Sequence, residues 1–223
     1  GESPPGDRPL AGEVLLGGAD TISTLDGDDL VIGGADADRI DVGAGNNVAM
    51  GDNGRITAAT VDAPSWNLAQ GRAQAGLGLL VGLALVLTLA RAQTINASIG
   101  GKDRIKSGAG NDVIFGGADG DEITAGGGTN IVFGDHGFVD WVALDNDPSD
   151  VDLVWSTDTA LGGADTIITG DGDDLVIGGT DADIIFVAEG DNVVLGDNGQ
   201  ITSATQDVPS WGGVSSDLSL VLT

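Results

Sequence analysis

The chain has 223 residues and a formal net charge of −27, because 35 acidic residues stand against eight lysines and arginines. It carries 39 glycines but only four tryptophans, four phenylalanines and no tyrosine, so its core has few large side chains and its charge opposes compaction. This charge excludes nucleic acid as a partner, since phosphates would be repelled, and favours a divalent metal. The absence of cysteine excludes disulfides and thiolate zinc sites.

In chain order, residues 1–14 form a leader segment in which no signal peptide is recognisable. Three related blocks follow. Residues 16–66 align without a gap with residues 161–211 at an offset of 145, and a third copy begins near Ser98. We therefore expect repeat blocks at residues 15–59, 98–142 and 160–204, because internal repeats of this kind build tandem architectures.

Each block has a shorter period of nine residues. The eighth place of successive units is aliphatic, as in Ile22, Val31 and Ile40. The sixth place is acidic or amidic, and every block ends on a Gly-Asp-x-Gly tetrapeptide whose aspartate is Asp52, Asp135 or Asp197. The sixth-place residues are Asp20, Asp29, Asp38 and Asn47 in the first block, Asp103, Asp112, Asp121 and Asn130 in the second, and Asp165, Asp174, Asp183 and Asn192 in the third.

These units resemble those of the RTX, or hemolysin-type, calcium-binding repeat family, whose nonapeptide reads G-G-x-G-x-D-x-U-x with U a large aliphatic residue. The clearest matches are residues 33–41 and 116–124, although both carry an aspartate at the fourth place, where the family has glycine. The resemblance implies an all-β fold. We expect parallel β-roll or β-solenoid blocks, in three tandem copies joined by linkers.

The resemblance also implies Ca²⁺ as the cofactor. Calcium takes six to eight oxygen ligands, and glycines let tight turns direct backbone carbonyls inward. In the family's roll one coil holds two units, so ligands 18 residues apart meet. The implied pairs are Asp20–Asp38, Asp29–Asn47, Asp103–Asp121, Asp112–Asn130, Asp165–Asp183 and Asp174–Asn192. They predict on the order of six ions, with Asp52, Asp135 and Asp197 as further candidate ligands and folding coupled to binding.

Places seven and nine of alternate units are apolar and should point out of the roll, because side chains alternate along a strand. Such a patch is typical of an interface. Two occupants remain open: the linkers fold back over the patch, or blocks and subunits stack into a fibre or lattice. The candidate interface residues are Leu30, Ile32, Val113, Phe115, Ile131, Phe133, Leu175 and Ile177.

The linkers are expected at residues 60–97, with an apolar insertion, and at 143–159, while residues 205–223 form a linker strand toward a possible next block. The apolar run at 75–90 is short for a bilayer. Part of it, residues 83–88, matches residues 218–223. We therefore expect a strand or helix that covers the apolar sheet, and not a membrane span, and we expect the chain to be a segment of a longer array.

No metalloprotease, serine–histidine or phosphate-loop motif is present, and the single histidine, His136, stands in a turn, so we expect no enzyme. The sequence predicts a calcium-stiffened structural module of an extracellular or cell-surface bacterial adhesin, fibre or surface layer. Its partners would be calcium ions and neighbours in a homo-oligomer or filament. The alternative is the carboxy-terminal RTX region of a secreted enzyme or toxin, and a weaker one is a calcium buffer.

Overall fold

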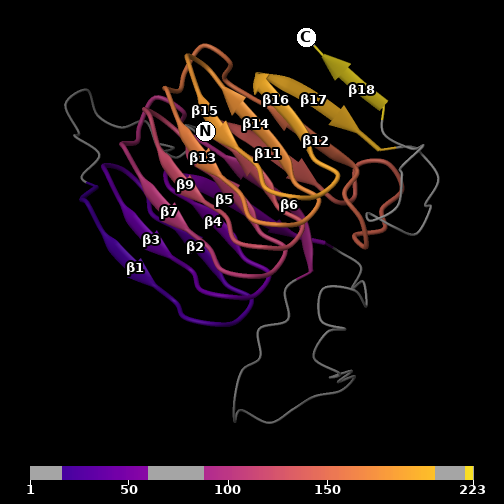
Figure 1. The fold of residues 1–223 in the computed structure, drawn as a ribbon, viewed down its shortest axis with the longest axis horizontal. Coiled ribbons are helices and arrows are strands. Elements are labelled where there is room, and N and C mark those ends of the chain that lie inside the picture. The colour runs from indigo at the N-terminus through magenta and orange to yellow at the C-terminus, as the bar shows by residue number, and fades with distance from the viewer. Residues whose placement is uncertain (1–16, 60–87, 204–218, 223) are drawn as a thin grey trace, which may run out of the picture.

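The computed structural model describes residues 17–59, 88–203 and 219–222. Their strands form three six-stranded sheets, which we name A, B and C. Sheets A and B are parallel, and sheet C is antiparallel (Figure 1). The fold expected from the repeats, a parallel β-roll in tandem copies, is confirmed.

Sheets A and B are built from strands of three to five residues, because each unit offers only a short stretch around its aliphatic place between two glycine-rich turns. Sheet A contains, in spatial order, β1 (Thr21–Ser23), β3 (Arg39–Asp41), β7 (Arg104–Lys106), β9 (Glu122–Thr124), β13 (Thr166–Ile168) and β15 (Ile184–Phe186). Sheet B contains, in the matching order, β2 (Leu30–Ile32), β4 (Val48–Met50), β8 (Val113–Phe115), β10 (Ile131–Phe133), β14 (Leu175–Gly179) and β16 (Val193–Asp197).

The three repeat copies stack into one continuous roll. Strand β3 of the first copy pairs with β7 of the second, and β9 of the second pairs with β13 of the third. Sheet B crosses the same two joints through β4–β8 and β10–β14. The coils therefore keep one register from β1 to β15 (Figure 1).

The interior of the roll is filled by the aliphatic residue of each unit. Ile40, Ile105, Ile123 and Ile167 of sheet A face Ile114, Val132 and Val176 of sheet B, and each is at most 1% exposed. A fully buried side chain of this size contributes about 1.5–3 kcal/mol by leaving water. The period of nine thus supplies the first hydrophobic core.

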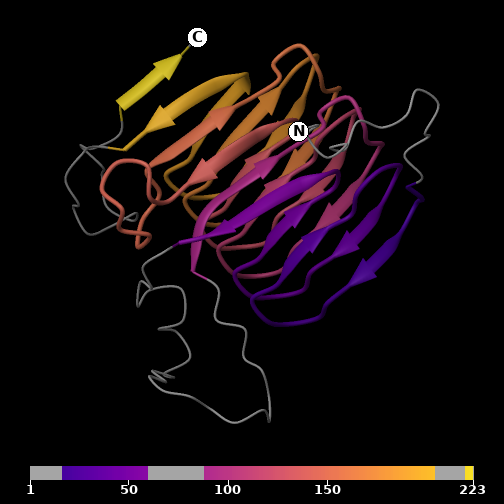
Figure 2. The ribbon, with the colours of Figure 1, turned by 180° about the vertical axis from the view of Figure 1, so that it is seen from behind.

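Sheet C is formed by the segments that leave and re-enter the roll. Its strands are, in spatial order, β5 (Gly54–Ala58), β6 (Leu89–Thr94), β11 (Gly137–Asp140), β12 (Leu153–Ser156), β17 (Gly199–Thr202) and β18 (Ser219–Leu222). Figure 2 shows these strands in front of the roll. Strands β6 and β12 lie in the ranges expected to be linkers, and β18 lies in the expected linker strand at residues 205–223.

A second hydrophobic core lies between sheets B and C. Phe115 and Phe133 stack there with ring centroids 4.8 Å apart, and Leu89, Val139 and Val154 of sheet C close over them. Of the eight candidate interface residues, Val113, Phe115, Ile131, Phe133, Leu175 and Ile177 are at most 7% exposed, whereas Leu30 and Ile32 at the edge of sheet B remain 40% exposed. Over most of this face the occupant is sheet C, in which the linker strands β6 and β12 pair with β11 and β17 from the expected blocks themselves.

The apolar run at residues 75–90 lies mostly outside the described residues, which resume at Thr88, and β6 begins at Leu89. The leader at residues 1–14 also lies outside them. Within the described ranges, no helix has the length and apolar character needed to cross a membrane.

Candidate metal centre

The sixth-place residues fall into two files, one at each side of the roll. The first turn row is the set of turns that lead into sheet A, and the second turn row leads from sheet A to sheet B. The first row ends on Asp20, Asp38, Asp103, Asp121, Asp165 and Asp183. The second row ends on Asp29, Asn47, Asp112, Asn130, Asp174 and Asn192.

Along the first turn row the aspartates form a ladder. The amide of Asp20 donates to Oδ1 of Asp38 at 2.7 Å, and the same bond, 2.7–2.9 Å long, recurs at every step to Asp183. The structure thus brings together the pairs expected 18 residues apart. It also joins Asp38 to Asp103 and Asp121 to Asp165, pairs that sequence spacing missed because they bridge copies.

The second oxygen of these carboxylates has no hydrogen-bond partner. Oδ2 is buried and unpartnered in Asp38, Asp103, Asp121, Asp165 and Asp183. Such an oxygen is costly to leave unsatisfied, all the more when it carries charge. An ordered file of such oxygens therefore offers carboxylate ligands that a cation could satisfy.

A file of glycines makes room for these oxygens. A Cβ built on Gly116 would lie 2.3 Å from Oδ2 of Asp121 and 2.0 Å from the carbonyl oxygen of Gly134. The same overlap, with one Asp Oδ2 and one glycine carbonyl, occurs at Gly33, Gly51, Gly134 and Gly178. Carboxylate and carbonyl oxygens are the donors that Ca²⁺ prefers, so the residues present fit the ion.

Burial and neighbouring carboxylates make these aspartates weak acids in the absence of an ion. Burial, with Asp103 and Asp165 close by, raises the pKa of Asp121 to about 10. Burial likewise raises the pKa of Asp165 to about 8 and that of Asp103 to about 7. A divalent cation beside them would reverse this cost, because an opposite charge favours the ionised form.

The second turn row differs because asparagines alternate with aspartates. Nδ2 of Asn130 donates to the carbonyls of Gly126 and Gly128 at 3.0 and 3.2 Å, and to Oδ1 of Asp174 at 2.9 Å. Asn47 makes equivalent bonds to Gly45 and Asp112. The asparagine amides thus bind carbonyl oxygens of their own turns, while Oδ2 of Asp29, Asp112 and Asp174 stays unpartnered.

The aspartates of the Gly-Asp-x-Gly tetrapeptides, which we name the closure carboxylates, bind backbone. Asp52 accepts the amides of Gly101 at 3.0 Å and Ala118 at 2.5 Å, both in the next copy. Asp135 accepts those of Gly163, at 2.8 Å, and Thr180. Burial raises their pKa values to about 7 and about 6. Asp52 and Asp135 therefore fasten one copy to the next, a role that the sequence did not reveal, whereas Asp197 is exposed.

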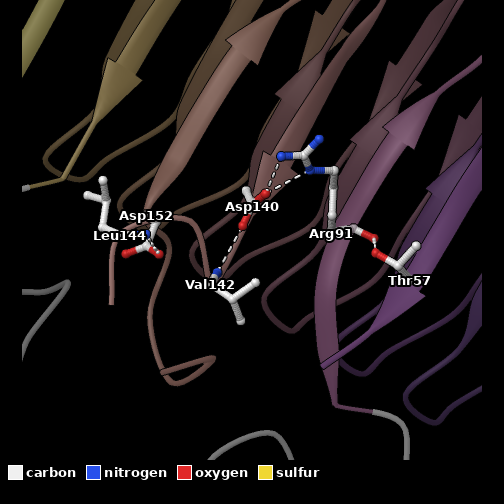
Figure 3. A network of polar contacts seen from close by, with 6 residues as sticks. All are labelled: Thr57, Arg91, Asp140, Val142, Leu144 and Asp152. Atoms are coloured by element: carbon white, nitrogen blue, oxygen red, sulfur yellow. Dashed lines mark hydrogen bonds and ion pairs between the residues drawn. The ribbon is translucent and has the colours of Figure 1, made fainter. Parts of the chain in front are cut away.

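A further acidic group, missed by the period of nine, lies in the loop before β12. Asp145, Asp150 and Asp152 place carboxylate oxygens within 4.8 Å of one another. Oδ2 of Asp152 accepts the amide of Leu144 at 2.8 Å, as Figure 3 shows. In the same view Arg91 pairs with Asp140 and thereby ties β6 to β11. The density of aspartates at residues 145–152 was the available signal.

The comparison with protein families gives three matches to one model. The model of the RTX calcium-binding nonapeptide repeat (4 copies) matches residues 16–49, 99–135 and 159–199, just over half of the chain. Neither the curated proteins nor the solved structures contain a match. The matched segments carry both turn rows and the ladder of aspartates. The chain belongs to the RTX calcium-binding repeat family, and calcium is the ion that its nonapeptide turns bind.

Proposed function

We propose that the chain is a structural module of an extracellular bacterial adhesin, fibre or surface layer that folds and stiffens on binding Ca²⁺ and associates with its own kind. The observation that supports this proposal is the file of unpartnered Oδ2 atoms, which runs through all three copies without a break. A ladder that crosses the joints between copies couples them into one rod.

The first turn row is the proposed principal calcium site. Its ligands would be the six ladder aspartates and the carbonyls of the glycine file. When bound, calcium supplies the positive charge that these carboxylates lack. The chain's own residues set the spacing of the coils through the Oδ1–amide bonds, and they hold each Oδ2 at its glycine.

The second turn row would contribute through Asp29, Asp112 and Asp174. Its asparagines Asn47, Asn130 and Asn192, expected as ligands, would instead act as neutral donors that replace part of the cation's role. The closure carboxylates Asp52 and Asp135 would hold the copies in register and leave metal binding to the ladder.

The alternative function, a carboxy-terminal region that assists export of a secreted enzyme or toxin, relies on the same calcium-coupled folding. The structural role is favoured by one observation. Linker strands and the last strand of each copy together build sheet C over sheet B, so that the copies form a single covered rod. Such a rod suits a load-bearing or spacing element.

The test is a titration of chelator-treated protein with Ca²⁺, followed by circular dichroism and light scattering, with Mg²⁺ as the matched control. We expect a transition from coil to β-structure with Ca²⁺ and a much weaker one with Mg²⁺. A rise in scattering that follows the transition would support the structural role over the export role. A chain that is β-folded in chelator and indifferent to Ca²⁺ would contradict the proposal.

A further inference from the structure

The two joints between copies are built alike. At each joint the earlier copy donates two backbone amides, one from each turn row, to side chains of the later copy. Its closure carboxylate in turn accepts backbone amides from the later copy. The first joint uses Asp38 to Asp103, Asn47 to Asp112 and Gly101 to Asp52. The second joint uses Asp121 to Asp165, Asn130 to Asp174 and Gly163 to Asp135.

The two ends of the roll carry the unused halves of this joint. The offset of 145 makes Asp183, Asn192 and Asp197 of the last copy the equivalents of Asp38, Asn47 and Asp52. The same offset makes Gly18, Asp20 and Asp29 of the first copy the equivalents of Gly163, Asp165 and Asp174. One end therefore presents donors and a closure carboxylate, and the other presents the matching acceptors and amides.

Exposure at the last coil indicates a contact surface. Val194 occupies a core place and is 43% exposed, whereas its equivalents Val132 and Val176 are fully buried. Beside it, Ile184 and Phe186 of β15 are 54% and 62% exposed. The closure carboxylates Asp52 and Asp135 are 2% exposed, but Asp197 is exposed. A core valine and a closure carboxylate, which the joints bury, are thus open at this end.

The first coil likewise exposes apolar residues whose equivalents in later copies are buried. Leu30 and Ile32 of β2 are 40% exposed, and Ile22 of β1 is only partly buried, while its equivalent Ile167 is fully buried. Parallel sheet edges with free amides and carbonyls are templates for a further strand. Figure 1 places β1 and β15 at opposite ends of the roll.

We propose that a second copy of this chain stacks on the first, end to end, with its first coil on the last coil of its neighbour. Asp197 would accept the amides of Gly18 and Ala35 of the next chain. The amide of Asp183 would donate to Asp20 of that chain. Because the contact joins two different surfaces, it stays open at both ends and generates a filament.

The occupant follows from the pairing chemistry. A contact between two first coils would set Asp20 against Asp20, acceptor against acceptor, and one between two last coils would set donors against donors. Only the contact of last coil with first coil reproduces the joint that the chain already makes twice. The proposal rests on the proposed function, because the joint adds one more carboxylate step to the ladder and thus needs the same cation.

The test uses single cysteines, which are clean probes because the chain has no cysteine of its own. In the two joints Arg39 faces Arg104 and Glu122 faces Thr166 as Cα partners. The equivalent partners across the proposed joint are Ile184 and Thr21 of the next chain, both exposed. Full-length Thr21→Cys and Ile184→Cys are oxidised in Ca²⁺, each alone and as an equal mixture.

We expect disulfide dimers in the mixture at several times the yield of either variant alone. If either variant alone gave as much dimer as the mixture, the contact would be symmetric and the proposal would be overturned. The absence of dimer from the mixture would overturn it as well. Circular dichroism of the same samples reports the calcium transition separately. A normal transition without cross-linking overturns this inference alone, whereas a missing transition counts against the proposed function, and the cross-link yield still decides the joint.

A second variant tests the closure carboxylate. Asp197→Ala should weaken association measured by sedimentation about tenfold, since it removes the acceptor of two amides. Asp147→Ala, an exposed aspartate in the loop before β12 and outside both end coils, is the matched control and should leave association unchanged. Equal association of Asp197→Ala and the unaltered chain would contradict the assigned contact.

Discussion

The amide of Asp121 donates to Oδ1 of Asp165 at 2.7 Å, although the two residues stand 44 positions apart and in different repeat copies. This bond is identical in kind to the one that joins Asp103 to Asp121 within a copy. The aspartate ladder therefore joins two coils of one copy and two coils of neighbouring copies by the same hydrogen bond. The three copies are therefore joined into one continuous roll.

Asp121→Asn should keep the hydrogen bond of the ladder while removing the negative charge that would bind calcium. An asparagine can still accept the Asp103 amide, but it is neutral at every pH and so removes the cost of protonating or charging a buried carboxyl group. We expect the chelated protein to become more stable and the midpoint of the Ca²⁺ titration to rise about tenfold, the effect of losing about 1.4 kcal/mol of binding free energy. Asp119→Asn, an exposed position in the same turn, is the control and should leave the midpoint unchanged.

The stability of the chelated protein should fall as the pH rises. The pKa values of Asp103, Asp165 and Asp121 lie at about 7, 8 and 10 in the folded chain, above the ordinary 3.8. Between pH 3.8 and these raised pKa values, the folded state binds more protons than the unfolded state. Protonation therefore stabilises the folded chain at low pH, and this stability is lost as the pH rises through the pKa values of the folded state.

Thermal unfolding in chelator at pH 5, 7 and 9 measures this dependence. We expect the melting temperature to decrease along the series. Saturating Ca²⁺ should abolish or reverse the decrease, because the ion replaces the protons. A chelated protein that melts at a higher temperature at pH 9 than at pH 5 would contradict the assignment of buried, unpaired carboxylates.

Gly116→Ala should damage the calcium cradle directly. Its Cβ would overlap Oδ2 of Asp121 and the carbonyl of Gly134, so the turn must shift at a cost of about 1–3 kcal/mol. We expect a lower melting temperature in Ca²⁺ and weaker binding by calorimetry. Gly18→Ala is the control, since a Cβ added at Gly18 would have no heavy atom within 4 Å. The measurement uses dilute protein, so that the proposed end-to-end association, in which Gly18 takes part, does not contribute.

Asn130→Asp should convert a neutral step of the second turn row into a charged one. The change removes the amide hydrogens that bind the Gly126 and Gly128 carbonyls and adds a charge beside Asp174. We expect about 1–3 kcal/mol lower stability in chelator and a larger stabilisation by Ca²⁺. Denaturant unfolding with and without the ion measures both. An equal loss in the two conditions would mean that the row does not bind calcium.

Phe133→Ala should show what sheet C contributes. Phe133 is 1% exposed and stacks on Phe115 between sheets B and C, so its truncation should cost about 3–5 kcal/mol. Phe186→Ala removes the same side chain from a position that is 62% exposed, and it should leave the unfolding of dilute protein nearly unchanged. Similar losses in both variants would contradict the placement of the second core.

The sequence alone determined the coil. Glycines at fixed places allow the tight turns, and one aliphatic residue per nine, as in Ile40 and Val31, fills the narrow interior. The aspartates that follow the turns then meet at intervals of 18 residues. These features are local and repeated, so they carry the resemblance to the RTX repeat, which implied the parallel roll, its ion and the pairs of residues that meet within each copy.

The tertiary structure decided what lies between the copies. No local pattern states that Asp38 meets Asp103, because that register depends on where a long linker returns the chain. Sheet C combines linker strands with the last strand of each copy, and there Leu89 and Val139 cover the apolar side of sheet B, a gain that depends on the whole surface. The same packing gives Asp52 and Asp135, which the sequence predicts as metal ligands, hydrogen bonds to backbone amides of the next copy.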